Sequence, residues 1–156
     1  LLQIAVTLHA CGKFISMKNS NECGYALIMS TEIIGLSHLE REIIANVVRY
    51  NIRDFDYDMM QLETEAGQDL AGVSDRTAIT ILIAKLTAIL RLANSMDKTH
   101  KSKLIDCRMA VREGQLVITT GYKGDLALES ASFEQKAAFF EEIFGIRPVL
   151  KQKRRV

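Results

Sequence analysis

Hydrophobic and polar positions follow a helical period through the first hundred residues of the chain. The apolar positions of the segment 1–15 recur every three or four residues, which predicts a buried helix. Residues 9–13 interrupt this helix, and Gly12 among them weakens it or allows a close backbone approach. The polar residues 16–22 predict a loop, and a second short apolar helix is expected over residues 23–34.

A capping pattern predicts where a third helix begins. Gly35 is a candidate C-cap for the second helix. Shortly after it, Ser37 and Glu40 have the spacing of a capping box, in which a hydroxyl and a carboxylate satisfy backbone amides at a helix N-terminus. The helix that begins there is expected to run to about Asn51, with its apolar residues on one face.

The strongest apolar pattern lies further along the chain, at Arg76–Met96. Apolar residues cover most of the circumference of this predicted helix, which is typical of a helix buried on several sides. Ser74 or Asp75 can cap it. The acidic stretch 51–74 is expected to be mainly a long, solvated connection, with a cation site as the alternative. The long helix is therefore the expected centre of an all-α bundle.

Beyond about residue 102 the period changes from that of a helix to that of a strand. Apolar and polar residues alternate over 105–111, and a second strand is expected over 116–120. The turn at 112–115 joins them, so the pair predicts a β-hairpin. A further short strand is expected at 126–129.

The end of the chain is expected to form a helix and a last strand. Ser132 can cap this helix, and Gly145 can end it. The last strand, 146–151, contains Pro148, the only proline of the chain, which suits an edge strand. A helix between two strands of one sheet favours parallel pairing of those strands.

These elements predict the α+β fold class. An all-α helical domain is expected over residues 1–102, followed by a small ββ(β)αβ domain over residues 103–156 that ends in a basic tail. Almost half of the residues are apolar, which is enough for a sizeable core. The net charge of +1 gives no whole-chain argument for binding to nucleic acid or to a membrane.

Cysteine usage and the apolar segments favour a cytoplasmic location. The three cysteines are an odd number without a C-x-x-C pair, so a disulfide framework or a structural zinc site is not expected. The apolar region 79–92 is interrupted by Lys85 and Arg91 and is too short to span a membrane. The chain opens on Leu1 inside an expected helix, so we expect it to be a piece of a longer protein.

Four segments in order resemble one protein family. Residues 8–15, LHACGKFI, are similar to the LHDIGKFI element of the exopolyphosphatase/guanosine pentaphosphate phosphohydrolase family. Residues 25–37, YALIMSTEIIGLS, resemble that family's YYLIMNSEIPGLS. Residues 47–51, VVRYN, and 90–100, LRLANSMDKTH, resemble VARYH and LRLADALDRSH. The resemblance covers essentially the whole chain and implies an HD-like helical domain followed by a small α/β domain.

The resemblance also implies how such a portion is used. In that family, N-terminal actin-like ATPase-fold domains of the same chain carry the phosphohydrolase site, where Mg²⁺ is expected. The C-terminal portion contributes to homodimer formation and holds the long polyphosphate substrate. The implied reaction of the whole protein is stepwise removal of terminal phosphate from polyphosphate, or phosphate removal from guanosine pentaphosphate.

The metal ligands of an active HD site are replaced in this chain. Such a site gathers histidine and aspartate side chains around divalent metals, which activate a water molecule. The resemblance aligns the expected ligand positions as follows: His9, Ala10, Asn21, Cys23, Asn51 and Asn94. Only His9 keeps a metal-binding side chain of the expected type, so we predict no metal and no catalytic residue in this chain. An unorthodox site formed by His9 with Glu22, Cys23 and Asp97 is the alternative.

Surface cations are the remaining candidates for chemistry. Lys and Arg side chains can line a track for a polyanion. The candidate residues for polyanion binding are Arg49, Lys13, Arg53 and Lys18, with Arg49 first because Arg49-Tyr50 matches the family motif. The alternative interpretation is an ordinary solvated face.

Three functional hypotheses remain open at this point. The first is a non-catalytic portion of an exopolyphosphatase-like protein that contributes to polyphosphate binding and dimerisation. The second is a degenerate HD domain that acts as a regulatory or oligomerisation module without polyanion contact. The third is a working phosphohydrolase with an unusual metal site, which would retain a divalent metal through purification.

Overall fold

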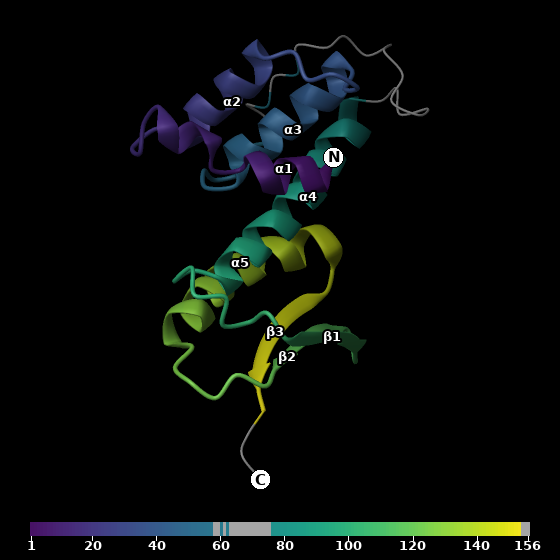
Figure 1. The fold of residues 1–156 in the computed structure, drawn as a ribbon. Coiled ribbons are helices and arrows are strands. Elements are labelled where there is room, and N and C mark those ends of the chain that lie inside the picture. The colour runs from purple at the N-terminus through teal and green to yellow at the C-terminus, as the bar shows by residue number, and fades with distance from the viewer. Residues whose placement is uncertain (58–59, 61, 63–75, 154–156) are drawn as a thin grey trace. The chain divides into compact units, whose positions relative to one another are not determined.

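The computed structural model describes residues 1–57, 60, 62 and 76–153, and Figure 1 shows their fold. Helices and a three-stranded sheet confirm the predicted α+β class. The chain divides into two compact units, Leu1–Leu90 and Arg91–Val156, which are described separately. The division falls inside one long helix, whereas the predicted domain boundary at residue 102 follows that helix. That boundary stays a prediction.

The first helical segment is interrupted as predicted. Helix α1 spans Leu2–Leu8, and a short 3-10 helix, η1, spans Cys11–Phe14. Gly12 is buried in η1, and a Cβ atom at this position would lie 1.9 Å from the backbone oxygen of Ser20. The chain therefore needs glycine here, because η1 approaches the next helix with no room for a side chain.

Helix α2 spans Ser20–Ser30, so two predicted boundaries are wrong. The helix begins inside the predicted loop and ends well before Gly35. It stops at Ser30 because Thr31 takes an extended conformation, and the Thr31 hydroxyl donates to the Leu27 carbonyl at 2.7 Å. Gly35 lies instead in the loop that follows, where its φ of 89° suits glycine.

Helix α3 spans His38–Tyr50 and begins with the predicted capping box. The Ser37 hydroxyl accepts from the Glu40 amide at 3.2 Å, and the Glu40 carboxylate accepts from the Ser37 amide at 2.8 Å. All residues from 42 to 48 are buried, so α3 is enclosed around its circumference. The core of the first unit is formed by these buried side chains, among others: Ala5, Ile28, Leu39, Ile43, Ile44, Val47, Tyr50, Ile79, Ile83 and Leu90.

Helix α4 spans Arg76–Met96, as predicted. Its candidate caps Ser74 and Asp75 lie outside the described residues, as does most of the predicted connection before it. By length and composition α4 could cross a membrane, but 44% of its apolar window is buried inside the protein. Ile83, Ala84, Ala88 and Leu90 on this helix are at most 1% exposed, which is the behaviour of a core helix.

The second unit contains the predicted hairpin. Strands β1 (Cys107–Arg112) and β2 (Gln115–Thr120) pair antiparallel. Glu113 and Gly114 form the turn between them with φ values of 49° and 73°. Two left-handed residues in a two-residue turn match the twist of the strands that they join.

The last helix begins earlier than predicted, and the expected short strand is absent from this part of the described chain. Helix α5 spans Ala127–Phe144, so residues 126–129 form its start and Ser132 lies within it. The Asp125 carboxylate accepts from the Ala127 amide at 2.8 Å, which supports the earlier start. Gly145 ends α5 as predicted, with φ 68°.

Strand β3 (Arg147–Gln152) completes a sheet with the order β1-β2-β3. It pairs parallel with β2 and lies at the sheet edge, so the predictions for Pro148 and for the crossover are confirmed. Buried side chains of α5 and the sheet form the core of this unit: Ile118, Leu126, Phe133, Ala137 and Phe140.

Candidate functional site

His9 is the expected ligand position that keeps its histidine. Its side chain contacts the backbone of the helix that precedes it. It follows α1, and its Nδ1 atom lies 2.6 Å from the backbone oxygen of Val6. A carbonyl oxygen only accepts hydrogen bonds, so we assign the ring proton to Nδ1. The neighbouring Ala10 has no ligand atom. This arrangement is that of a histidine which closes a helix end rather than of a metal ligand pair.

The other expected ligand positions do not assemble a metal site in the described part of the chain. Asn21 and Cys23 lie half-buried in α2, Asn51 is the buried C-cap residue of α3, and Asn94 lies half-buried in α4. Residues 1–57, 60, 62 and 76–153 contain no group of three His, Cys, Asp or Glu side chains placed to hold a metal ion. The residues present therefore do not fit the metal that an active HD site requires.

The two carboxylates of the alternative metal site, Asp97 and Glu22, already bind other groups of the protein. Asp97 accepts from the Ser102 amide at 2.8 Å. Glu22 is bound by two arginines, as described below. Both carboxylates thus have partners of their own within the protein.

Close packing occupies the region where α2 begins. A Cβ atom on Gly24 would lie 3.0 Å from Cγ1 of Val48 and 3.7 Å from Sγ of Cys11.

Burial raises the pKa of the Cys11 thiol, against the opposing effect of backbone hydrogen bonds. A raised pKa keeps this thiol protonated near neutral pH, so Cys11 does not suit the role of a nucleophile.

Arg49 and Arg53 converge on one carboxylate, Glu22. Arg49 donates from Nε to Oε1 of Glu22 at 3.0 Å, and its Nη2 lies 2.9 Å from Oε2. Arg53 donates from Nη1 to Oε1 at 3.0 Å. The guanidinium carbon of Arg49 also lies 4.9 Å from the ring centroid of Tyr25. We call Glu22, Tyr25, Arg49 and Arg53 the arginine cluster.

The charges of the arginine cluster stabilise one another. Burial raises the pKa of Glu22, but the hydrogen bonds and charges of Arg49 and Arg53 outweigh that effect and leave the pKa below its usual value. Burial lowers the pKa of Arg49, and the hydrogen bond and charge of Glu22 more than reverse it. Glu22 and Arg49 are therefore ionised at neutral pH. Together with the guanidinium of Arg53, the cluster carries a formal charge of +1.

Lys13 and Lys18 differ from the two arginines. Lys13 lies on η1 and Lys18 in the loop that follows, and both are exposed. Within the described residues, neither lysine side chain makes a hydrogen bond or an ion pair. The contact of Gly12 with Ser20 places η1 against the start of α2, the helix that carries Glu22. The four predicted cations thus come from adjacent elements, and two of them are already paired.

Sequence reasoning missed the role of Glu22. The residue is separated by 27 positions from Arg49, so no local pattern links the two. The contact of Tyr25 with the guanidinium of Arg49 was also not predicted. The available signal was a pair of arginines four residues apart, Arg49 in the last turn of α3 and Arg53 just after that helix.

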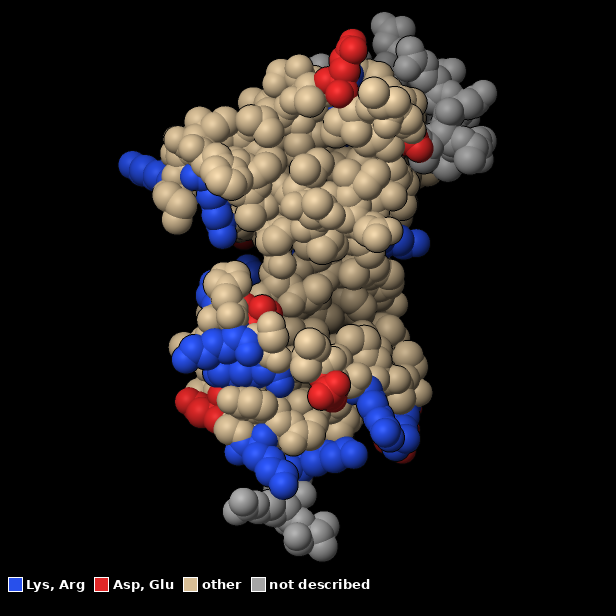
Figure 2. Space-filling view, in the orientation of Figure 1, with Lys and Arg blue, Asp and Glu red and all other residues tan. Residues whose placement is uncertain are grey.

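Charge is distributed unevenly between the two units. Residues 1–90 contain 7 Lys and Arg against 11 Asp and Glu, whereas residues 91–156 contain 13 against 8. Figure 2 shows several Lys and Arg side chains on the surface of the sheet-containing unit. The net charge of +1 conceals this difference, and the four predicted cations belong to the more acidic unit.

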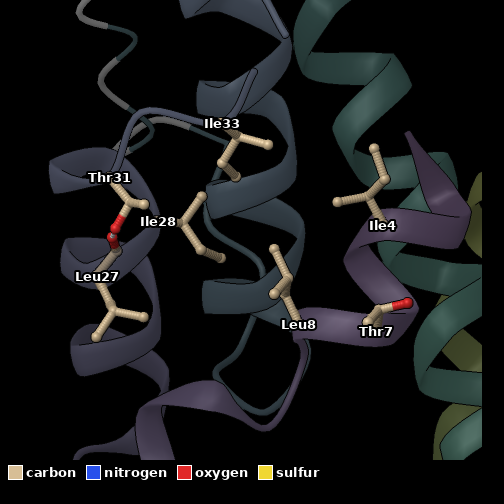
Figure 3. Close-up of a pocket in the computed structure, with 7 residues that line it drawn as sticks. All are labelled: Ile4, Thr7, Leu8, Leu27, Ile28, Thr31 and Ile33. Carbon is tan, nitrogen blue, oxygen red and sulfur yellow. Dashed lines mark hydrogen bonds between the residues drawn. The ribbon is translucent and has the colours of Figure 1, made fainter. Parts of the chain in front are cut away.

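An apolar pocket of about 350 Å³ lies between α1 and α2 (Figure 3). Its lining residues are Ile4, Thr7, Leu8, Leu27, Ile28, Thr31 and Ile33. The two hydroxyls in this lining donate to backbone oxygens of their own helices, Thr7 to Gln3 and Thr31 to Leu27. No charged side chain lines the pocket, so it does not suit a phosphate ligand.

Comparison with known proteins identifies a family that the chain matches. The sequence profile of the family described as Ppx/GppA phosphatase, domain III, matches residues 1–137, which is well over half of the chain. No curated protein matches the chain.

Proposed function

Because the chain belongs to the Ppx/GppA phosphatase family, through domain III, we propose that it binds polyphosphate and supports dimerisation without itself performing hydrolysis. The family match confirms the predicted resemblance. Polyphosphate binding and dimer formation go beyond that match and are the proposal.

The single observation that carries the proposal is the arginine cluster together with the exposed lysines beside it. Arginine guanidinium groups recognise phosphate through two parallel hydrogen bonds, and lysine ammonium groups act as point charges. Arg49 already makes such a two-bond contact with a carboxylate, so its fork is held in the geometry that an oxyanion needs. Lys13 and Lys18 are exposed to solvent and add positive charge from the neighbouring element.

The absence of hydrolysis in this chain is proposed because the residues at the expected ligand positions do not suit a metal. The methyl group of Ala10 cannot ligate, and the amides of Asn21 and Asn94 are weak ligands compared with imidazole or carboxylate. In the proposal, other domains of the same protein carry the Mg²⁺-dependent site. They would remove terminal phosphate from polyphosphate or from guanosine pentaphosphate in the cytoplasm.

A second candidate function is favoured by one observation. Glu22 neutralises part of the charge of Arg49 and Arg53, so both guanidinium groups already have an ionic partner without a bound ligand. This supports a regulatory or oligomerisation module that makes no contact with a polyanion. The two candidates differ in whether polyphosphate binds to the chain at all.

The double variant Lys13→Ala/Arg49→Ala tests the polyphosphate proposal. We expect its affinity for polyphosphate to fall, and the slope of log K against log salt to become smaller by about one to two, because each lost cation releases fewer counterions. Fluorescence titration at several salt concentrations measures both quantities. Thermal unfolding of the variant shows whether the fold is retained.

A matched control is Lys85→Ala/Lys123→Ala, which removes the same number of charges from exposed positions elsewhere. The proposal expects this variant to bind almost as tightly as the wild type. Equal affinities of all three proteins would show that Lys13 and Arg49 do not hold the polyanion.

A further inference from the structure

We propose that Glu22 is an internal competitor for the anion site formed by Arg49 and Arg53. Its carboxylate takes the place that a phosphate group of the ligand would occupy, so a polyanion must displace it to reach both guanidinium groups. This inference rests on the proposed function, because it assigns a mode of regulation to the same arginines. The sequence offered Glu22 only as a candidate metal ligand, and family membership does not assign it a role as a competitor.

The geometry of the contact is that of an oxyanion site with its anion in place. Nε and Nη2 of Arg49 face the two carboxylate oxygens of Glu22 at 3.0 and 2.9 Å, and Nη1 of Arg53 shares Oε1 at 3.0 Å. A phosphate group presents oxygen atoms to an arginine fork in the same planar, two-bond manner. The same donors cannot serve Glu22 and a phosphate fully at one time.

The site is preformed on the protein side. Arg49 lies in the last turn of α3, and its guanidinium lies over the ring of Tyr25, which belongs to α2. This contact limits the orientations of the guanidinium independently of Glu22. Removal of the carboxylate would thus leave Arg49 in place to receive another anion.

The competitor is accessible and can leave without a change of backbone. The side chains of Glu22 and Arg53 are 42% and 45% exposed, whereas that of Arg49 is 26% exposed. Glu22 has rotatable side-chain bonds and is more exposed than Arg49. Ion pairs with this exposure are weak in water, so an incoming anion does not meet a large barrier.

The competition favours anions with many charges. A single inorganic phosphate must replace Glu22 with its own contacts alone, while a long chain also gains contacts with Lys13 and Lys18. The expected ligand is therefore a linear chain of several phosphate groups, and the carboxylate lowers the affinity for short anions. Glu22 would act as a threshold that separates polyphosphate from the phosphate that its hydrolysis releases.

The substitution Glu22→Gln tests this proposal in the 156-residue chain. It removes the competing charge and keeps the size of the side chain. We expect a long-chain polyphosphate to bind about twofold to fivefold more tightly, because the weak, exposed ion pairs of Glu22 with Arg49 and Arg53 no longer compete. The relative gain for pyrophosphate should be at least as large. Isothermal titration calorimetry at low salt measures both affinities.

Glu32→Gln is the matched control, since it removes one exposed carboxylate of the same unit that lies outside the cluster. A general charge effect would raise the affinity equally in both variants, and that result would overturn the proposal. In an Arg49→Ala/Arg53→Ala background, the proposal expects Glu22→Gln to add no more affinity than Glu32→Gln. A larger gain in that background would also contradict it.

Further outcomes separate this proposal from the proposed function. If the wild type binds polyphosphate and Glu22→Gln binds no more tightly, the competitor role is wrong while polyphosphate binding stands. If neither protein binds, both proposals are wrong. Should Glu22→Gln prove too unstable to measure, Glu22→Asp keeps the charge but shortens its reach, and an affinity above that of the wild type is then expected.

Discussion

Gly12 is the residue whose identity the structure restricts most clearly. A Cβ atom there would lie 1.9 Å from the oxygen of Ser20 and 2.5 Å from the nitrogen of Gly24. Both neighbours are backbone atoms, so no side-chain rotation relieves the clash. The sequence left two interpretations of Gly12 open, a weakened helix or a close backbone approach, and the structure shows a close approach. The sequence did not reveal the role of Glu22, whose partners are distant in the chain.

Gly12→Ala is accordingly expected to destabilise the protein by about 1–3 kcal/mol, the range for overpacked sites, because η1 must move away from α2. Urea unfolding followed by circular dichroism measures the change. Gly121→Ala is the matched control, since a Cβ at Gly121 meets nothing within 4 Å. Equal stability of the two variants would contradict the close contact.

At the level of elements, the helices and strands with strong local signals were predictable and the start of α5 was not. The capping box of α3 and the long period of α4 gave their bounds correctly. The residues 126–129, LALE, were predicted to form a short strand after a turn, but Glu129 is buried against groups from another segment. Such tertiary partners decide the conformation, and a local pattern does not contain them.

Glu129 links α5 to the segment after α4. Its carboxylate accepts a hydrogen bond from the Thr99 hydroxyl and pairs with Lys103 at 3.0 Å, and its side chain is fully buried. The Thr99 hydrogen bond is the largest influence on its pKa, burial opposes it, and Lys103 adds to it. The result is a pKa lowered from the usual 4.5 to about 2.

This lowered pKa predicts a pH-dependent stability. The unfolded chain takes up the proton at a higher pH than the folded one, so the contribution of Glu129 is complete above about pH 4.5 and is lost as the pH falls towards about 2. Glu129→Gln is expected to be less stable than the wild type at pH 7 and to lose less stability across that window. Thermal unfolding of both proteins, measured between pH 2 and 7 at intervals of about one pH unit, checks this expectation.

Glu113→Gln is the control for that comparison, because Glu113 is an exposed residue of the hairpin turn. Its curve should run parallel to that of the wild type. If Glu129→Gln also ran parallel to the wild type, the buried carboxylate of Glu129 would not be the source of the pH dependence.

At the scale of the whole molecule, the family and the fold class were predictable from the sequence. The ion pairs that the predicted cations make were not. Four short segments carried the family resemblance, and the domain III match over residues 1–137 confirms it. The pairing of Arg49 and Arg53 with Glu22 depends on how α2 and α3 pack, which spacing along the chain does not specify. The central proposal is that a domain whose expected metal-ligand positions are mostly replaced binds a polyanion through its surface cations.

Salt-dependent titration of the wild-type chain with long-chain polyphosphate tests that claim most directly. The claim predicts saturable binding at low salt, with log K falling linearly against log salt at a slope of about −2 to −3 for up to four neutralised phosphates. Absence of binding at low salt, or an affinity that does not change with salt, would contradict it.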